Sequence, residues 1–240
     1  NIFKKINENA LNSASIAQIH TAISKNNEKL IIKIVKPNIE KNIKNDIFIL
    51  KILAKTTHIL FKNIRRLKPI DIINELEINL KNEINLKNEA INIIKIRKNI
   101  KSDKNIYIPK IKINLTNKDI ITMEYLDGIN IINKEKLIKT KINTKIIINN
   151  LLESLYKQIF KYELFHADLH PGNILISKDN FDNAIIIFID FGIISKLKKN
   201  TKSYIAKNLL AFSNRNYKKV AKLHLKSKTI ITNKKYNEIE

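Results

Sequence analysis

Short apolar runs separated by polar turns predict β-strands in the first half of the chain. Ile16–Ala22 and Leu30–Val35 are rich in β-branched residues, and the turn-like segment Ser24–Asn27 lies between them. Two more short apolar runs follow at Ile106–Ile108 and Ile120–Met123. We therefore expect a small sheet built from these runs.

Longer segments repeat apolar residues at three- and four-residue intervals, which is typical of amphipathic helices. The predicted helices are Asn38–Leu60, Pro69–Ile100, Lys145–Tyr162 and Thr201–Lys226. Between the last two, the apolar runs Ile174–Ile176 and Ala184–Ile189 predict a short hairpin around a turn at Lys178–Asn183.

The order of these elements predicts the fold class. Strands and helices segregate along the chain, which is typical of α+β proteins. The Asp127-Gly128 pair interrupts the pattern and indicates a boundary near Glu124–Gly128. We expect a bilobal fold with a small strand-plus-helix N-lobe at residues 1–124 and a mainly helical C-lobe at residues 125–240.

The composition excludes several classes of protein. Of 240 residues, 44% are hydrophobic and 28% are charged, as in folded globular proteins, which excludes disorder and collagen-like structure. The chain has no cysteine, so disulfides, thiolate catalysis and cysteine-bound zinc are excluded. The apolar runs fall short of the roughly 18 residues that a transmembrane helix needs, and we expect no membrane span here.

The formal net charge is +23, from 45 Lys and Arg against 22 Asp and Glu. Lysine, isoleucine and asparagine are all in excess, as a genome rich in A and T would produce, so we interpret the charge as spread over the surface. It still predicts affinity for anionic lipid or polyanions at low salt. No aromatic residues are interleaved with the basic ones in the manner of nucleic-acid-binding proteins, and we expect no nucleic-acid partner.

The strongest chemical signal is the segment His166–Asn173, which is followed by Asp190–Gly192. Phosphoryl transfer needs one carboxylate to orient the attacking hydroxyl. It also needs a second carboxylate and an amide oxygen to hold magnesium against the phosphates. Asp168, Asp190 and Asn173 can take these three roles in that order.

Two other interpretations of this segment stay open on the residues alone. His166, Asp168 and His170 could make only loop hydrogen bonds. They could also bind a metal ion, because their side chains are metal ligands at positions i, i+2 and i+4.

A kinase-like site also needs a lysine on a central strand, paired with a glutamate on a helix. Lys33 is the one cation inside the apolar run Leu30–Val35, where burial without a partner would be unfavourable. Glu83, Asn85 and Glu89 on the helix that follows Pro69 are candidate partners. A solvent-facing lysine and a solvated helix face remain the alternatives.

The loop expected to cover the phosphates departs from ordinary kinases. The segment Asn12–His20 reads Asn-Ser-Ala-Ser-Ile-Ala-Gln-Ile-His and has no glycine, although alanine reaches positive φ less readily than glycine. The hydroxyl groups of Ser13 and Ser15 and the backbone N–H groups could still contact phosphates.

With these motifs the chain resembles the UbiB family of atypical protein-kinase-like proteins, which carries an alanine-rich loop in place of the glycines. The similarity covers nearly the whole chain. The resemblance implies a kinase-like fold with Asp168 as the catalytic residue, and Asn173 and Asp190 as magnesium ligands. The ATP-binding residues that it implies are Ser13, Ala14, Ser15, Ile16, Ala17, Gln18, Lys33, Glu89 and Glu124. The supporting residues are His166, Glu83, Phe191 and Gly192.

Three departures from the family pattern stand out. Asn12 replaces the usual alanine at the start of the loop, and Asn85 replaces the usual aspartate of the Glu-x-Asp motif, which puts a metal or regulatory role of that carboxylate in doubt. The family's N-terminal Lys-x-Gly-Gln helix and its hydrophobic C-terminal segments have no match. We therefore expect a segment of a longer protein that contains the kinase-like core.

The resemblance implies binding of ATP and Mg²⁺, and ATPase or phosphotransferase chemistry that supports ubiquinone biosynthesis. It also implies contact with ubiquinone-pathway enzymes or lipid intermediates and with an anionic membrane, at the cytoplasmic face of the bacterial inner membrane. A small-molecule phosphotransferase and a catalytically idle nucleotide-binding scaffold are the alternative functions.

Overall fold

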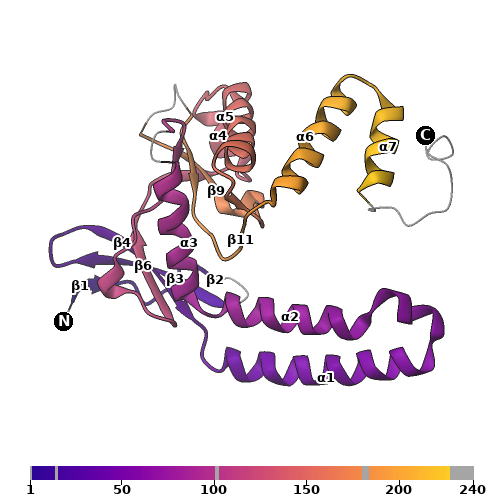
Figure 1. Ribbon diagram of the computed structural model, residues 1–240. Helices are drawn as coiled ribbons and strands as arrows, with labels where there is room; N and C mark the ends of the chain where they lie inside the picture. The colour runs from indigo at the N-terminus through magenta and orange to yellow at the C-terminus, as the bar shows by residue number, and fades with distance from the viewer. Residues whose placement is uncertain (1, 14–15, 101–102, 180–183, 228–240) are drawn as a thin grey trace. The chain divides into compact units, whose positions relative to one another are not determined.

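The computed structural model describes residues 2–13, 16–100, 103–179 and 184–227. Contacts between Cα atoms divide the chain into two compact units. The first unit is Asn1–Ser154 with His166–Ile194, and the second is Leu155–Phe165 with Ser195–Glu240. The lobe boundary that we expect near Glu124 stays a prediction. Figure 1 labels the helices α1–α7 and several of the strands.

The first unit contains an antiparallel sheet in the order β1-β3-β4-β6, with β2 paired to β3. Its strands are β1 (Phe3–Ile6), β2 (Asn12–Ser13), β3 (Ala17–Ser24), β4 (Lys29–Val35) and β6 (Ile120–Glu124). Three of the predicted runs are therefore confirmed as strands of this sheet, whereas the run at Ile106–Ile108 forms β5 (Ile106–Tyr107) in a second sheet, so the expected single sheet is wrong. Lys33 lies in β4 opposite Ile19 of β3 and Ile121 of β6, so this cation is at the centre of the sheet.

The helices that follow form a long hairpin and then a separate core helix. They are α1 (Ile39–Leu60), the 3₁₀ segment η1 (Lys62–Leu67), α2 (Pro69–Glu83) and α3 (Leu86–Asn99). Figure 1 shows α1 and α2 side by side, and the two helices contact each other. We refer to residues 39–83 as the α1–α2 hairpin.

The single helix that we predicted from Pro69 to Ile100 is wrong, because the structure has two helices there. The break falls at Ile84 and Asn85, and the Asn85 side chain accepts a hydrogen bond from the Lys87 N–H at 3.2 Å. Asparagine favours helix N-caps over helix interiors, since its side chain competes for backbone groups. The residue that departs from the family motif therefore starts α3.

A second sheet in the first unit has the order β5-β10-β9-β7. Its strands are β5 (Ile106–Tyr107), β7 (Gly128–Asn130), β9 (Ile174–Ser177) and β10 (Ile186–Phe188). The antiparallel pair β9–β10 is the predicted hairpin. Residues 180–183 of its turn lie outside the described residues. Gly128 fits here because a Cβ at this position would lie 2.8 Å from the Cβ of Leu175.

Shorter elements complete the described chain. In the first unit these are η2 (Ile113–Leu115), α4 (Lys134–Lys139), η4 (Pro171–Asn173) and the larger part of α5 (Thr144–Tyr156). The predicted helix Lys145–Tyr162 corresponds to α5 and one π-helical turn, η3 (Lys157–Lys161). The two-residue strands β8 (Phe165–His166) and β11 (Ile194–Ser195) lie where the chain passes from one unit to the other.

The second unit contains α6 (Lys199–Ser213) and α7 (Tyr217–Lys226), which contact each other. We predicted one continuous helical stretch, but Arg215 has a positive φ of 54° and ends it. The Asn216 side chain then caps α7 by accepting from the Lys219 N–H at 3.0 Å. The Tyr204 hydroxyl and His224 Nδ1 form a 2.7 Å hydrogen bond between the two helices.

Within the part of the chain that the structure describes, no helix combines the length and the apolar composition needed to cross a bilayer.

Candidate active site

A cavity of about 740 Å³ in the first unit brings together residues that are far apart in the sequence. Nine of the predicted site residues line it: Ile16, Lys33, Glu83, Glu89, Glu124, Asp168, Asn173, Asp190 and Gly192. The two acidic residues Asp168 and Asp190, the carboxamide of Asn173 and the strand lysine therefore share one cavity. Their roles in binding and catalysis stay predictions at this point.

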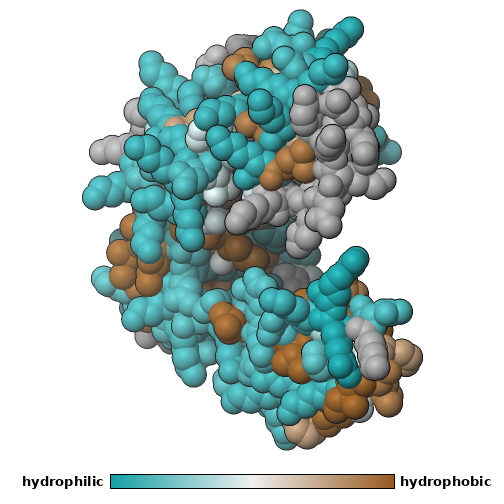
Figure 2. All heavy atoms as spheres, turned by 45° about the vertical axis from the view of Figure 1, so that its right-hand side comes forward, coloured by the Kyte–Doolittle hydropathy of each residue, from teal (hydrophilic) through white to brown (hydrophobic). Residues whose placement is uncertain are grey.

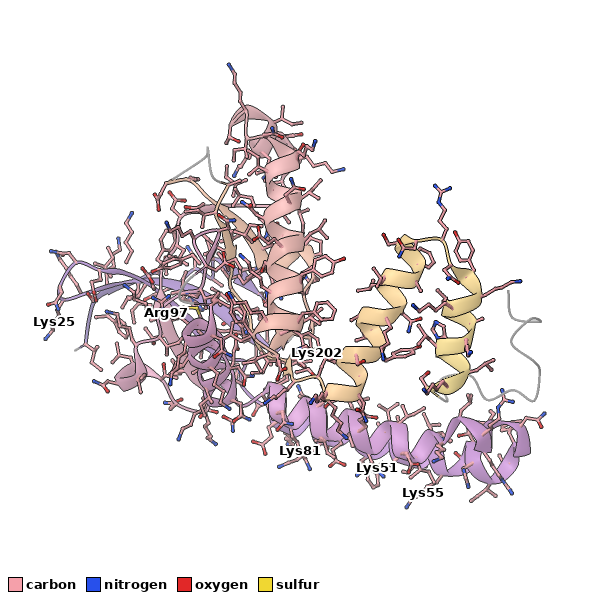
Figure 3. The ribbon with its side chains drawn as sticks, turned by 45° about the horizontal axis from the view of Figure 1, so that its top comes forward. Lys25, Lys51, Lys55, Lys81, Arg97 and Lys202 are labelled. Atoms are coloured by element: carbon pink, nitrogen blue, oxygen red, sulfur yellow. The ribbon has the colours of Figure 1, made fainter. Side chains whose placement is uncertain are left out.

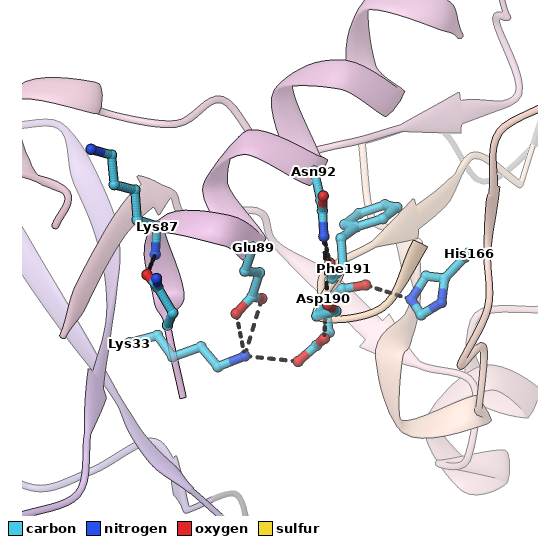
Figure 4. Close-up of polar contacts among 9 residues, drawn as sticks. Lys33, Lys87, Glu89, Asn92, His166, Asp190 and Phe191 are labelled. Carbon is cyan, nitrogen blue, oxygen red and sulfur yellow. Dashed lines mark hydrogen bonds and ion pairs between the residues drawn. The ribbon is translucent and has the colours of Figure 1, made fainter. Parts of the chain in front are cut away.

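The Lys33 side chain lies between two carboxylates (Figure 4). Its Nζ is 2.8 and 3.0 Å from the carboxylate oxygens of Glu89 and 2.8 Å from Oδ2 of Asp190. The side chains of Lys33 and Glu89 are only 9% and 4% exposed. Such a pair is stable only because each charge has its partner, since an unpaired charge at this depth would be strongly destabilising.

Burial alone would lower the pKa of Lys33, but the carboxylates of Glu89 and Asp190 outweigh it and raise that pKa above its ordinary value. Burial likewise acts to raise the pKa of Asp190, and the Lys33 ammonium reverses this and lowers it. The lysine is therefore a fixed cation in the cavity and Asp190 a fixed anion at neutral pH.

Glu89 reaches Lys33 because α3 begins four residues before it, at the Asn85 cap. The buried residues Leu86, Ala90 and Ile93 hold this side of α3 against the core. Of the three partners that spacing left open, the structure places only Glu89 on the lysine. Asn85 lines a different cavity and uses its side chain as a helix cap.

The Asp190-Phe191-Gly192 loop is held from two sides. Oδ1 of Asp190 accepts from the Gly192 N–H at 3.0 Å, and the Asn92 amide donates to the Phe191 carbonyl at 3.0 Å. The Phe191 ring is fully buried and packs on His166 with ring centroids 5.1 Å apart. These contacts fix the loop, and the Asp190 carboxylate lines the cavity.

Sequence reasoning missed Asn92. It follows Glu89 by three residues, so both side chains project from the same face of α3. The three-residue spacing from Glu89 could have identified Asn92, because it places a second polar side chain on the side of α3 that faces the site. Through these two residues α3 contacts both Lys33 and the Asp190–Gly192 loop.

The neutral His166 ring connects the loop that carries Asp168 to the loop that carries Asp190 through two hydrogen bonds. Its Nδ1 accepts from the Asp168 N–H at 3.1 Å, which places the ring proton on Nε2, and Nε2 donates to the Asp190 carbonyl at 2.5 Å. Burial lowers the pKa of His166, which favours this neutral form. Both ring nitrogens are thus engaged, and the alternative of a His166–Asp168–His170 metal site is wrong.

Asn173 is fixed through its backbone. Its N–H donates to the His170 carbonyl at 3.0 Å, and its carbonyl accepts from the Ile189 N–H at 3.2 Å. Asn130, which sequence reasoning also missed, lines the cavity and donates from its amide to the Gly172 carbonyl at 2.9 Å. These contacts hold the loop that carries Asp168 and Asn173 close to the strand that leads into Asp190.

The alanine-rich loop lies between β2 and β3, where Asn12 is opposite Ile19 and Ser13 opposite Gln18. Ile16 and Asn12 line the cavity, whereas Ser13, Ala17 and Gln18 are not among its lining residues. Ser13 and Gln18 are exposed and Ala17 is fully buried. Ala14 and Ser15 lie outside the described residues. ATP contacts from this loop stay a prediction.

Glu124 and Glu83 line the cavity from different elements. The Glu124 carboxylate accepts from the Tyr107 hydroxyl at 3.0 Å and from the Lys110 N–H at 3.1 Å, so it fastens the end of β6. Glu83 is at the C-terminus of α2, where burial and then the Asp190 carboxylate raise its pKa.

The donor set fits magnesium bound together with a nucleotide. Mg²⁺ prefers hard oxygen ligands and usually takes one or two carboxylates, with phosphates and water completing the shell. The Asp190 carboxylate and the Asn173 carboxamide supply such oxygens in a cavity that also holds the Lys33 ammonium. Among the described residues, no group of three or more His, Cys, Asp or Glu side chains is placed to hold a metal ion by itself.

Comparison with known proteins identifies the family to which the chain belongs. Residues 1–224 match the model of the ABC1 atypical kinase-like domain. A probable protein kinase UbiB from Marinobacter nauticus is 34% identical over 239 residues, covering 100% of this chain and 44% of that protein. The Blochmanniella pennsylvanica protein of the same name is 38% identical over 226 residues, covering 94% and 41%.

A solved structure also shares the fold. The structure of Rv3197 from Mycobacterium tuberculosis, determined in complex with erythromycin, aligns with a TM-score of 0.73 at 18% identity, over 94% of this chain and 55% of that one. The present chain spans less than half the length of the curated relatives described above. The expected kinase-like α+β fold is confirmed, and the chain belongs to the ABC1 atypical kinase-like family, with relatives named UbiB.

Proposed function

We propose that this chain is the core of a UbiB-type ATPase or phosphotransferase that binds ATP with Mg²⁺. The observation that carries the proposal is the single cavity lined by Lys33, Glu89, Asp168, Asn173 and Asp190. This set supplies the cation, the carboxylates and the amide oxygen that phosphoryl transfer requires.

Each residue has a distinct role in the proposal. Lys33, oriented by Glu89, contacts the α- and β-phosphates as a point charge. Asp168 orients the attacking hydroxyl or water by accepting its proton. Asp190 and Asn173 would hold Mg²⁺, which when bound neutralises charge that develops on the phosphate oxygens. The backbone beyond Glu124 would contact the adenine base.

We further propose that the activity supports ubiquinone biosynthesis at the cytoplasmic face of the inner membrane, with pathway enzymes or lipid intermediates as partners. Support comes from the name UbiB carried by the relatives and from the net charge of +23, which favours an anionic surface. ATP hydrolysis fits better than phosphorylation of peptides, because in the family that the chain resembles the N-terminal Lys-x-Gly-Gln helix occupies the substrate side of the active site and would exclude peptides.

Thermal unfolding with and without Mg-ATP tests the nucleotide site. At a 100-fold excess over Kd, binding contributes about 2.7 kcal/mol, which raises Tm by about 5 °C in a chain of this size. We expect Asp190→Asn to lose the Mg²⁺-dependent shift and Asp168→Asn to keep it while ATP turnover falls about 100-fold. Asp46→Asn, an exposed change on α1, serves as the matched control. Full protection of Asp190→Asn would contradict the proposal.

Acceptor assays separate the proposed enzyme from its alternatives. Transfer of the γ-phosphate to small alcohols would indicate a small-molecule phosphotransferase. Binding without turnover, in a chain whose Asp168→Asn variant behaves like the parent, would indicate an idle scaffold.

A further inference from the structure

One side of α1 carries apolar side chains that no neighbouring element of the first unit covers. Positions 48, 49, 52, 53, 56, 59 and 60 fall within an arc of about 140° on an α-helix. The apolar residues on this arc are between 49% and 72% exposed: Phe48, Ile49, Ile52, Leu53, Ile59 and Leu60. We call these six residues the α1 stripe.

The stripe continues around the end of the hairpin. Phe61 is 54% exposed and Leu67, in η1, is 62% exposed. Figure 2 shows hydrophobic surface at the lower right, over the end of the hairpin. The contacts of α1 with α2 use the opposite side of the helix, where Ile47 and Ala54 are buried. An exposed apolar surface that extends over several helical turns is typical of an interaction site.

Within the segment that carries most of the stripe, the charged residues are all cations. Residues 47–70 contain six lysines and arginines and no acidic residue, between Asp46 and Asp71. Lys51 and Lys55 lie along α1 (Figure 3), and Arg65, Arg66 and Lys68 are exposed at the end of the hairpin. Lys51 pairs with Glu77 of α2, whereas the exposed cations at the end of the hairpin are next to Leu67 in the sequence.

Two polar side chains near the stripe, those of Thr56 and Arg65, make hydrogen bonds within the hairpin. The Thr56 hydroxyl, on the arc itself, donates to the Ile52 carbonyl at 2.9 Å. The Arg65 guanidinium donates to the carbonyls of His58 and Ile59 at 2.8 and 3.2 Å, which satisfies the last turn of α1. Moving this surface out of water therefore leaves few unpaired polar groups behind.

We infer that the α1 stripe and the end of the hairpin form a binding element for the surface of an anionic membrane. An apolar helix face bordered by cations lies in the interface with its apolar side in the acyl boundary and its cations among the headgroups. A second copy of the chain fits this surface poorly, since pairing two such hairpins brings like charges together. This inference deepens the proposed membrane association and rests on it.

A single tryptophan can report on the hairpin, because the chain contains none. We expect the emission of F61W to shift to the blue with vesicles of phosphatidylcholine and phosphatidylglycerol, and to be quenched by lipids brominated along the acyl chains. The matched control is I132W, which replaces a residue that is 62% exposed outside the hairpin and should show neither effect. Equal quenching of both probes, or none for F61W, overturns the inference.

Vesicle sedimentation of the full 240-residue chain gives the energetics. The double variant Ile52→Gln/Leu60→Gln should bind the anionic vesicles about tenfold more weakly than the parent, and the parent should prefer them to pure phosphatidylcholine. Ile113→Gln/Ile132→Gln, which removes apolar residues of similar exposure elsewhere, should bind like the parent. If the hairpin variant binds vesicles normally but changes the oligomeric state, the stripe is a self-association surface and the inference is wrong.

The nucleotide site is measured separately in the same variants. Mg-ATP protection should be the same in the hairpin variants as in the parent. Hairpin-dependent vesicle binding without any ATP protection would contradict the proposed enzyme and leave the membrane element standing.

Discussion

The cavity and the α1–α2 hairpin differ in the burial of their charged and apolar residues. In the cavity, Lys33 and Glu89 are buried as an ion pair, and the nearby Phe191 is fully buried. On the hairpin, apolar residues are exposed, and the charged residues between positions 47 and 70 are all cations. The first region satisfies its groups internally around a space for a ligand. The second leaves its apolar surface exposed.

The two regions differ in how much the removal of one charged side chain should change the stability of the protein. Within the cavity, removing one charge leaves its partner buried and uncompensated, so stability and function change together. On the hairpin, an exposed ion pair such as Lys44 with Glu40 is screened by water and contributes little. The same residue types therefore predict different results according to their depth.

The largest effect is expected from breaking the buried pair. Glu89→Gln removes the main partner of Lys33, and we expect the free energy of unfolding to fall by about 3 kcal/mol. Urea unfolding of the purified chain measures it. Glu77→Gln on the hairpin, which removes the partner of Lys51 and Lys81, is the control and should lose far less. Similar losses in both variants would remove the distinction between the two regions.

The helix cap at Asn85 should show an intermediate effect. Asn85→Ala removes the acceptor for the Lys87 N–H and should lower the free energy of unfolding by about 1 kcal/mol. Asn85→Asp keeps a capping oxygen and restores the residue usual in the family, so its stability should match the parent. If Asn85→Asp instead changes the Mg²⁺ dependence of ATP protection, the side chain has a role at the nucleotide site that its present position does not provide.

The pH dependence should show the smallest effect and sharpen the comparison further. The pKa of Asp190 is lower in the folded chain than its ordinary value of 3.8, because of Lys33. Its contribution to stability is thus present above about pH 4 and is lost as the pH falls through the folded pKa. Unfolding between pH 3 and pH 6 should therefore flatten at the acid end in Asp190→Asn relative to the parent. An unchanged slope would show that the carboxylate is not held by the lysine.

Much of the fold around the site follows from local patterns. The β3 and β4 strands were predictable because their apolar residues are β-branched and a polar turn separates them. The very short strand β7 was not, since three residues that include Gly128 carry no periodicity. The break between α2 and α3 was missed because the apolar spacing continues across it, while the new helix is started by a single side-chain cap at Asn85.

The site was predictable to a different degree for each residue. The order of the motifs that contain Asp168, Asn173 and Asp190 predicts that the three residues share one site, and all three line the same cavity. The choice of Glu89 over Glu83 and Asn85 came only from the family resemblance, because spacing cannot show which side of a helix faces a strand far away in sequence. For the α1 stripe the sequence pattern predicts only a helix. The same apolar spacing occurs on a helix face that is buried in a core and on a face that is exposed. Three-dimensional structure decides between them.

The most direct test of the account is a crystal structure of the chain with Mn²⁺ and a non-hydrolysable ATP analogue, with the metal located by its anomalous signal. The account predicts Mn²⁺ bound jointly by the carboxylate of Asp190 and the carboxamide oxygen of Asn173, with Lys33 against the phosphates. A nucleotide bound with its metal away from both of these residues would contradict it.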